Sequence, residues 1–271
     1  MVEVHDRWAV AAAYEAFMGR WSRLVAREFV DWLEVQPRAH WLDVGCGTGA
    51  LTAAICELKT PASVIACDPS GPLVEMASAT LPDKRVTFEI AQAAHLPERP
   101  GAFDAVVSGL VLNFIPDPPR ALAAMRARLA ARGCVAAYVW DYAGGMEFLQ
   151  CFWREAVALD PDAAGLSEDV RFASWDAAAL ATLFREAGLA RVSTRAIEVQ
   201  THFDDFDDYW LPLLGRTGPA PSYVASLAPE RREALKERLL QRLPRQGDGR
   251  ICLAARAWAA RGSLDPEASG G

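Results

Sequence analysis

The sequence has no apolar run long enough to cross a bilayer. Its 271 residues are 52% hydrophobic, but Gly and Pro interrupt the apolar segments before they reach the roughly 18 to 20 residues that a spanning helix needs. Residues 1–10 also lack the basic start, apolar core and cleavage site of a secretory signal. We therefore expect a soluble, cytoplasmic protein with no membrane partner.

Paired cysteines are missing as well. The six cysteines are scattered through apolar segments without a C-x-x-C motif, which argues against a zinc site and against a disulfide framework. The four histidines show no metal-ligand spacing. We expect free buried thiols and no metal.

No cluster of Lys or Arg stands out, and the formal net charge is -7. A protein of this charge is repelled by phosphate backbones. We therefore expect a small-molecule substrate and not nucleic acid.

Short apolar runs alternate with helical periodicity from His40 onward, as in a parallel sheet built of βα units. One predicted helix begins with Asp117 as N-cap and Pro118 at its first position, and another, at 176–187, ends at Gly188. The predicted strands are 41–44, 63–67, 86–90, 105–107, 134–140, 192–199 and 251–258. We predict a single domain over residues 1–261 and a flexible tail at 262–271.

Three segments lie outside the minimal βα pattern. Residues 1–36 predict an N-terminal helical cap, and residues 142–175 and 201–249 are insertions rich in aromatic side chains. We expect these segments to form a helical lid at the carboxyl ends of the strands, where open α/β sheets bind ligands.

A glycine-rich turn follows the first predicted strand. Gly45, Gly47 and Gly49 let the backbone bend sharply and approach a ligand closely. The same spacing fits a dinucleotide-binding turn, so the glycines do not choose the cofactor. Asp68 closes the second strand, where a carboxylate can accept both ribose hydroxyls. The alternative role of Asp68 is to cap the next helix.

Five ordered segments then resemble one family. Residues 42–49 resemble motif I of class I S-adenosylmethionine-dependent methyltransferases, and Asp68 resembles the acidic residue after their second strand. Residues 92–97, 103–108 and 112–117, followed by Arg132-Gly133, are similar to the later motifs of the branch that includes ubiquinone and menaquinone C-methyltransferases, known as methyltransferase type 11. The resemblance covers about residues 40–139, half of the chain.

This resemblance implies a Rossmann-like, doubly wound and mostly parallel seven-stranded sheet with helices on both faces. It implies that S-adenosylmethionine binds at the glycine loop and leaves as S-adenosylhomocysteine. Gln92 stands where the family usually has an acidic or amide residue at the adenine, and Gln can still accept that hydrogen bond. The implied cofactor-binding residues are Asp43, Gly45, Gly47, Thr48, Gly49, Asp68, Pro69, Gln92, Ala93, Gly109 and Leu110.

A methyl sulfonium is already activated, so alignment of the acceptor suffices and no catalytic triad is required. No catalytic residue is assigned. The acceptor is expected to contact aromatic and sulfur side chains of the lid and of the fifth strand's end, for which core packing is the alternative role. These candidates are Tyr14, Met18, Trp21, Trp140, Tyr142, Tyr209 and Trp210.

Two other functions remain open at this point. One is a nicotinamide-dependent oxidoreductase built on the same glycine turn, which explains fewer motifs. The other is a cofactor-binding protein of the same fold without methyl transfer. Either a monomer or a homodimer is expected.

Overall fold

The computed structural model describes residues 15–216 and 218–265, which form two compact units. The sheet unit comprises Ser22–Val139, Trp175–Ile197 and Ala257–Gly271. The helical unit comprises Met1–Trp21, Trp140–Ser174 and Glu198–Arg256. Both predicted insertions therefore fall in the helical unit, apart from Trp175 at the end of the first. Among the described residues, no helix has the length and apolarity needed to cross a membrane.

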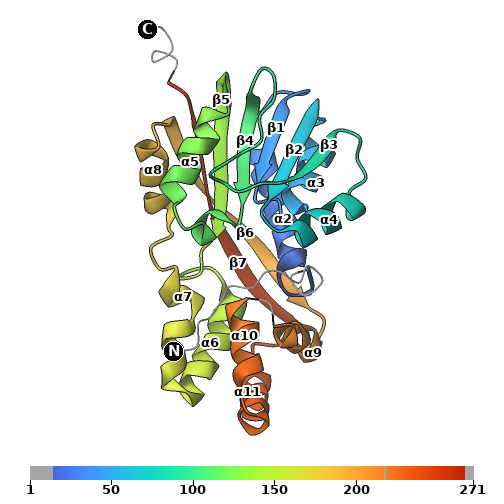
Figure 1. Ribbon diagram of the computed structural model, residues 1–271. Coiled ribbons are helices and arrows are strands. Elements are labelled where there is room, and N and C mark those ends of the chain that lie inside the picture. The colour runs from blue at the N-terminus through green and yellow to red at the C-terminus, as the bar shows by residue number, and fades with distance from the viewer. Residues whose placement is uncertain (1–14, 217, 266–271) are drawn as a thin grey trace. The chain divides into compact units, whose positions relative to one another are not determined.

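Seven strands form one sheet in the order β3-β2-β1-β4-β5-β7-β6. β1 pairs in parallel with β2 and β4, β2 pairs in parallel with β3, and β4 pairs in parallel with β5. The strands are β1 (His40–Val44), β2 (Ser63–Asp68), β3 (Val86–Ile90), β4 (Phe103–Gly109), β5 (Leu129–Trp140), β6 (Ala190–Phe203) and β7 (Ile251–Ser263). Figure 1 shows β1, β2 and β3 side by side, with α4 (Gly71–Thr80) next to β3.

Helices pack on both faces of the sheet unit, and its strands are therefore buried on both sides. Leu42 and Val106 point to the face that packs against Leu122 of α5 (Pro118–Ala127) and Phe184 of α8 (Ala177–Glu186). On the other face, Tyr138 packs against Phe29 of α2 (Arg20–Trp32), with ring centroids 4.5 Å apart. The predicted Rossmann-like α/β fold is confirmed.

Local signals explain where several helices begin and end. The Asp117 carboxylate accepts a hydrogen bond from the Arg120 amide at 3.1 Å and caps α5, and Asp176 caps α8 in the same way. α8 ends before Gly188, whose φ of 79° is in the left-handed region that glycine adopts easily.

The structure corrects some predicted boundaries. β5, β6 and β7 are longer than predicted, because their ends lack the apolar runs on which the prediction depended. Two leucines, Leu24 and Leu240, have exposed side chains. Cys134, Cys151 and Cys252 are only partly buried, although all six thiols are free as expected.

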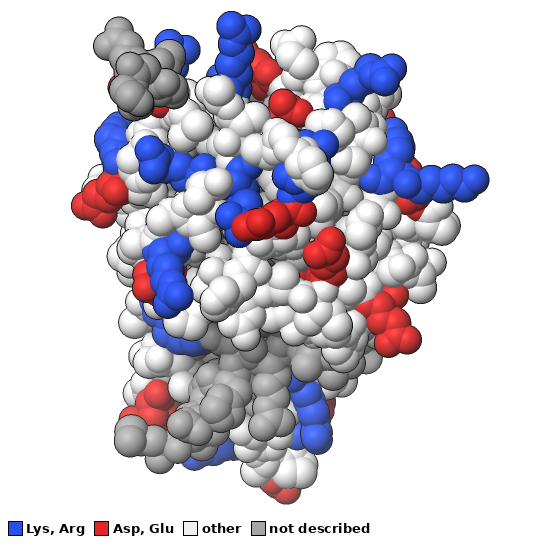
Figure 2. All heavy atoms as spheres, turned by 45° about the horizontal axis from the view of Figure 1, so that its top comes forward, with Lys and Arg blue, Asp and Glu red and all other residues white. Residues whose placement is uncertain are grey.

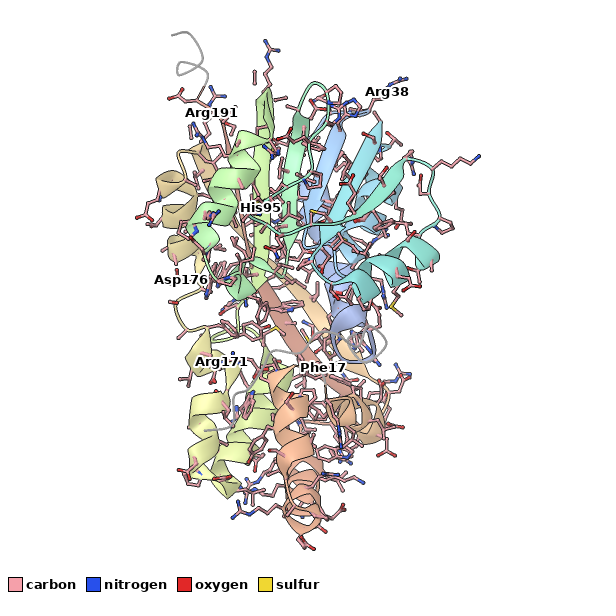
Figure 3. The ribbon with its side chains drawn as sticks, viewed as in Figure 1. Phe17, Arg38, His95, Arg171, Asp176 and Arg191 are labelled. Atoms are coloured by element: carbon pink, nitrogen blue, oxygen red, sulfur yellow. The ribbon has the colours of Figure 1, made fainter. Side chains whose placement is uncertain are left out.

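The helical unit contains α6 (Glu147–Leu159), α7 (Glu168–Arg171), α9 (Phe206–Trp210), α10 (Pro219–Ser226) and α11 (Pro229–Arg242). Short helical turns at Pro161–Leu166 and Leu211–Leu214 connect α6 to α7 and α9 to α10, and a further turn at Glu15–Gly19 precedes α2. An aromatic cluster lies within this unit, and Phe17, labelled in Figure 3, belongs to it. Phe148 packs against Phe17 and Trp21, with centroid distances of 5.7 and 4.3 Å. Aromatic burial therefore stabilises this unit.

Candidate cofactor site

The glycine loop connects β1 to α3 (Ala50–Leu58) in the sheet unit. Gly45, Gly47 and Gly49 all have positive φ, at 76°, 53° and 89°. The amides of Gly45 and Cys46 donate to the Cys67 carbonyl at 2.7 and 3.0 Å, which ties the loop to the end of β2. The backbone conformation thus demands glycine at three alternate positions.

Asp68 is the last residue of β2 and reaches into the glycine loop. Its Oδ2 accepts a hydrogen bond from the Gly47 amide at 3.1 Å, and its Oδ1 accepts one from the Ser70 amide at 2.9 Å. Burial raises the pKa of this carboxyl, while the two amides counteract that effect. α4 has Ser70, not Asp68, at its N-cap position. Each Asp68 oxygen keeps a lone pair for a further donor.

Asp43 lies in β1, one residue before the strand ends, and is fully buried. Its Oδ2 accepts a hydrogen bond from the Thr52 hydroxyl at 2.6 Å. Its Oδ1 is buried without a hydrogen-bond partner among the described residues. Burial raises the pKa of Asp43 to about 7, partly offset by the Thr52 hydrogen bond. A buried acceptor without a partner is costly, which indicates a polar group bound from outside the chain.

The segment after β4 lies against the glycine loop. A Cβ on Gly45 would come within 2.7 Å of Val111 Cγ1. Leu110 has a φ of 61°, which is uncommon for a residue with a side chain, and its amide donates to the Tyr138 carbonyl at 2.8 Å. Packing alone explains why residue 109 is glycine, since a Cβ there would lie 2.6 Å from the Tyr138 hydroxyl.

The predicted adenine segment forms a turn after β3. The Ala91 amide donates to the Asp68 carbonyl at 3.2 Å, and the His95 amide donates to the Gln92 carbonyl at 2.9 Å. His95 is labelled in Figure 3. The structure thus brings the start of this turn next to Asp68. Of the other predicted cofactor residues, Pro69 is exposed, and Thr48 and Ala93 are partly buried.

The predicted acceptor residues that the structure describes all lie in the helical unit and are buried. Trp21 and Tyr209 both pack against Phe203, and the Tyr209 hydroxyl donates to the Phe148 carbonyl at 2.8 Å. Trp210 stacks on Phe206, and Tyr142 packs against Phe172. Met18 and Trp140 are each 2% exposed, and Tyr14 lies outside the described residues. Acceptor binding by these side chains stays a prediction.

Among the carboxylates of the helical unit that have cationic partners, Asp141 and Asp208 lie close in sequence to predicted acceptor residues. Asp141, beside the predicted pair Trp140 and Tyr142, accepts a hydrogen bond from Arg256 Nε at 2.7 Å and another from the Gly144 amide at 2.9 Å. Asp208, in the acidic segment before Trp210, pairs with Arg20 at 2.6 Å.

Sequence reasoning did not single out four residues around this site. Thr52 is the partner of Asp43, and Val111 contacts the glycine loop. Ile90, paired in register with Asp68, exposes 68% of its surface. Asn113, in a short turn (Leu112–Phe114) after β4, has a buried amide without a partner among the described residues. Asn113 lies in the segment 112–117 that resembles a family motif, but that resemblance gave its side chain no role. The other three residues lie outside the matched segments, and only their contacts and exposure single them out.

Comparisons with known proteins agree with this geometry. A family model described as a methyltransferase domain matches residues 42–137. The malonyl-[acyl-carrier protein] O-methyltransferase of Geobacter sulfurreducens is 30% identical over 191 residues, covering 70% of this chain and 68% of that protein. The trans-aconitate 2-methyltransferase of Deinococcus radiodurans is 34% identical over 115 residues, covering 42% of this chain and 43% of the relative.

A solved structure supports the fold along nearly the whole chain. It is a methyltransferase in complex with the Haloferax volcanii Trm112 methyltransferase activator, with a TM-score of 0.57, 18% identity and coverage of 96% of this chain and 97% of that one. By contrast, the chain spans less than half the length of several curated relatives that it matches.

An α/β sheet with a glycine loop after β1 and an acidic residue at the end of β2 defines a class of nucleotide-cofactor-binding proteins. Within that class, the chain belongs to the class I S-adenosylmethionine-dependent methyltransferases. The family predicted from the sequence is confirmed, as is its cofactor, and the oxidoreductase alternative is not favoured.

The sheet unit fits S-adenosylmethionine on its own geometry. Apart from its two chain neighbours, no described residue has an atom within 4 Å of where a Cβ on Gly47 would lie, so the described part of the chain leaves open space at that point. Asp43 Oδ1 lacks a partner among the described residues, and Asp68 retains acceptor capacity. A cationic or hydroxylated ligand matches this set of acceptors.

Proposed function

We propose that this chain transfers the methyl group of S-adenosylmethionine to a small-molecule acceptor by direct in-line displacement. The observation that carries the proposal is the junction of the glycine loop with Asp68, through the 3.1 Å hydrogen bond from the Gly47 amide. When bound, the cofactor supplies an activated methyl group. The chain's own task is to hold both reactants in line and to exclude water.

Residues of the sheet unit have distinct roles in this proposal. Asp68 accepts the ribose hydroxyls, and its bond to Gly47 fixes the glycine loop, with Gly45, Thr48 and Gly49, under the amino-acid part of the cofactor. Asp43 offers its free oxygen to the ammonium group, either directly or through the loop. The strained backbone at Leu110 lets the chain approach the methionine part closely. Gln92 and Ala93 bind adenine.

We further propose that the acceptor presents a carboxylate oxygen. Two relatives are named for trans-aconitate and for malonyl-[acyl-carrier protein], which both carry free carboxylates. A carboxylate with an ordinary pKa near 4 is ionised at neutral pH, so it needs no general base before it attacks a methyl group.

In this proposal, as the sequence predicts, the side chains that bind the acceptor include Trp21, Tyr142 and Trp210. They are rigid aromatic surfaces, which bind ligands at little cost in conformational entropy. We propose that the protein is a monomer or a homodimer. Its substrates in this proposal are small molecules and not nucleic acid. Figure 2 shows basic and acidic side chains interspersed on the face it displays, in keeping with that choice. The six free thiols suit a reducing compartment such as the cytoplasm.

The test is methylation with labelled S-adenosylmethionine. The purified chain is incubated with trans-aconitate, with malonyl-coenzyme A, and with an amine and a phenol as controls. The proposal predicts a labelled product that mild base hydrolyses, as expected of a methyl ester. A base-stable product would overturn the carboxylate assignment. Absence of cofactor binding would overturn methyl transfer itself.

A further inference from the structure

Asn113 has an amide that the fold does not use. Both its Oδ1 and its Nδ2 are buried, and neither has a hydrogen-bond partner among the described residues. An amide offers two donors and an acceptor, and burying them unpaired costs free energy. A buried amide without a partner in the fold indicates that a bound ligand supplies the hydrogen bonds.

The backbone around Asn113 is, by contrast, hydrogen-bonded. The Phe114 amide donates to the Val111 carbonyl at 2.8 Å, and the Leu110 amide donates to the Tyr138 carbonyl at 2.8 Å. The turn at Leu112–Phe114 is therefore held by main-chain contacts, and the Asn113 side chain adds nothing to them. Its conformation does not require an amide at this position.

The position of Asn113 is at a ligand-binding edge. It follows β4, which lies next to β1 in the sheet order. The chain connects β1 to β2 on one side and returns to β4 on the other, so this pair of strands is the topological switch point at which open α/β sheets bind ligands. Val111, two residues earlier, packs against Gly45 of the glycine loop.

We infer that the Asn113 carboxamide hydrogen-bonds the methyl acceptor at this switch point. The inference rests on the proposed function, because it requires a second ligand beside the cofactor. The acceptor is expected to present an oxygen, either a carboxylate or a carbonyl, to the amide N–H groups.

The cofactor's own polar groups are matched by other residues in the proposed function. Asp68 takes the ribose, Gln92 and Ala93 take the adenine, and Asp43 with the glycine loop takes the amino-acid end. The amide of Asn113 is left over from that set. A neutral amide also suits an acceptor, since it orients an oxygen without adding a charge beside the sulfonium.

The first test uses Asn113→Leu, which replaces the amide by an apolar group of similar size. The melting temperature of the ligand-free protein should rise by about 2 to 4 °C, because a buried unpaired amide is removed. The calorimetric Kd for S-adenosylhomocysteine should stay within about twofold of the wild-type value. Ser108→Ala is the matched control: Ser108 lies five residues earlier, and its buried hydroxyl also has no partner among the described residues.

A lower melting temperature would show that the amide serves the fold and would overturn the inference. Weaker binding of S-adenosylhomocysteine would assign the amide to the cofactor and would overturn it equally. A wild-type protein that binds no S-adenosylhomocysteine would instead contradict the proposed function, and the melting temperature would still decide whether the amide serves the fold.

The second test observes the amide directly. The ¹⁵N side-chain signal of Asn113 is identified by its loss in Asn113→Leu, and the protein is saturated with S-adenosylhomocysteine before trans-aconitate is added. A shift of this signal supports the inference. A signal that stays in place, in a protein that methylates trans-aconitate, overturns it.

Discussion

The Thr52 hydroxyl donates a 2.6 Å hydrogen bond to Asp43 Oδ2 and leaves Oδ1 of the same buried carboxylate without a partner among the described residues. One oxygen thus holds the side chain in place while the other remains available. Thr52→Val removes this bond and should destabilise the protein by about 1 to 3 kcal/mol, because the carboxylate loses the hydrogen bond that compensates its burial. Thermal unfolding measures this, with Thr87→Val on the exposed side of β3 as control. Equal losses in both variants would contradict a special role for the Thr52–Asp43 pair.

Asp68→Ala should weaken S-adenosylhomocysteine binding by about 1.5 to 3 kcal/mol, or roughly ten- to a hundredfold in Kd. The substitution removes the acceptor for the ribose and the partner of the Gly47 amide together. Calorimetry provides the measurement, and Asp31→Ala, at an exposed position of α2, provides the control. An unchanged Kd for Asp68→Ala would remove Asp68 from the cofactor site.

Two glycines of the same loop should respond differently to alanine. At Gly45 the added Cβ would meet Val111 Cγ1 at 2.7 Å, so Gly45→Ala should lower the melting temperature strongly. At Gly47 no atom of the described residues beyond its chain neighbours lies within 4 Å of the added Cβ, and the positive φ alone costs about 1 to 2 kcal/mol. Gly47→Ala should therefore remain folded and lose S-adenosylhomocysteine affinity, as measured by calorimetry. A Gly47→Ala variant that binds normally would show that this open space is not where the cofactor lies.

Glu168 should make stability depend on pH. It is 2% exposed, and the Trp153 indole N–H donates to its carboxylate. Burial raises its pKa to about 7 from an ordinary value of 4.5, while that hydrogen bond, the nearby Arg171 and the Ala220 amide limit the rise. The native state therefore binds a proton more readily than the unfolded chain.

Because the folded-state pKa of Glu168 is the higher one, its contribution to the free energy of unfolding increases as pH falls from above 7 toward 4.5. Above pH 7 the buried carboxylate is charged, and its cost to stability is greatest. Glu168→Gln should gain on the order of 1 to 3 kcal/mol over wild type at pH 8 and little at pH 5. Urea unfolding at both pH values measures the difference in free energy of unfolding between Glu168→Gln and wild type. Because both proteins contain Asp43, its titration cancels in this difference. A gap that is the same at both pH values would contradict a raised pKa for Glu168.

Much of the sheet unit could be predicted from the sequence because its signals are local. Capping by Asp117 and Asp176, the glycines at positive φ and the apolar strands each depend on neighbouring residues, and all appear in the structure. The contacts that complete the site are not local. The pairing of Thr52 with Asp43, the approach of Val111 to Gly45 and the isolated amide of Asn113 depend on how distant segments pack.

The helical unit was harder to interpret for a related reason. Aromatic side chains such as Trp21 and Tyr209 suit a binding pocket and a core equally well in sequence. In the structure they are buried against Phe203, and the Tyr209 hydroxyl is bonded to a backbone carbonyl. Asp141 lies next to Trp140, but its partner Arg256 is 115 residues away in the sequence, too far for a local pattern to show.

The central claim is that the glycine loop and Asp68 bind S-adenosylmethionine, and thermal shift with S-adenosylhomocysteine and with NADH tests it most directly. Only a ligand of the native state raises the melting temperature. The account predicts a concentration-dependent rise with S-adenosylhomocysteine that Asp68→Ala reduces, and no rise with NADH. A rise with NADH alone would contradict it.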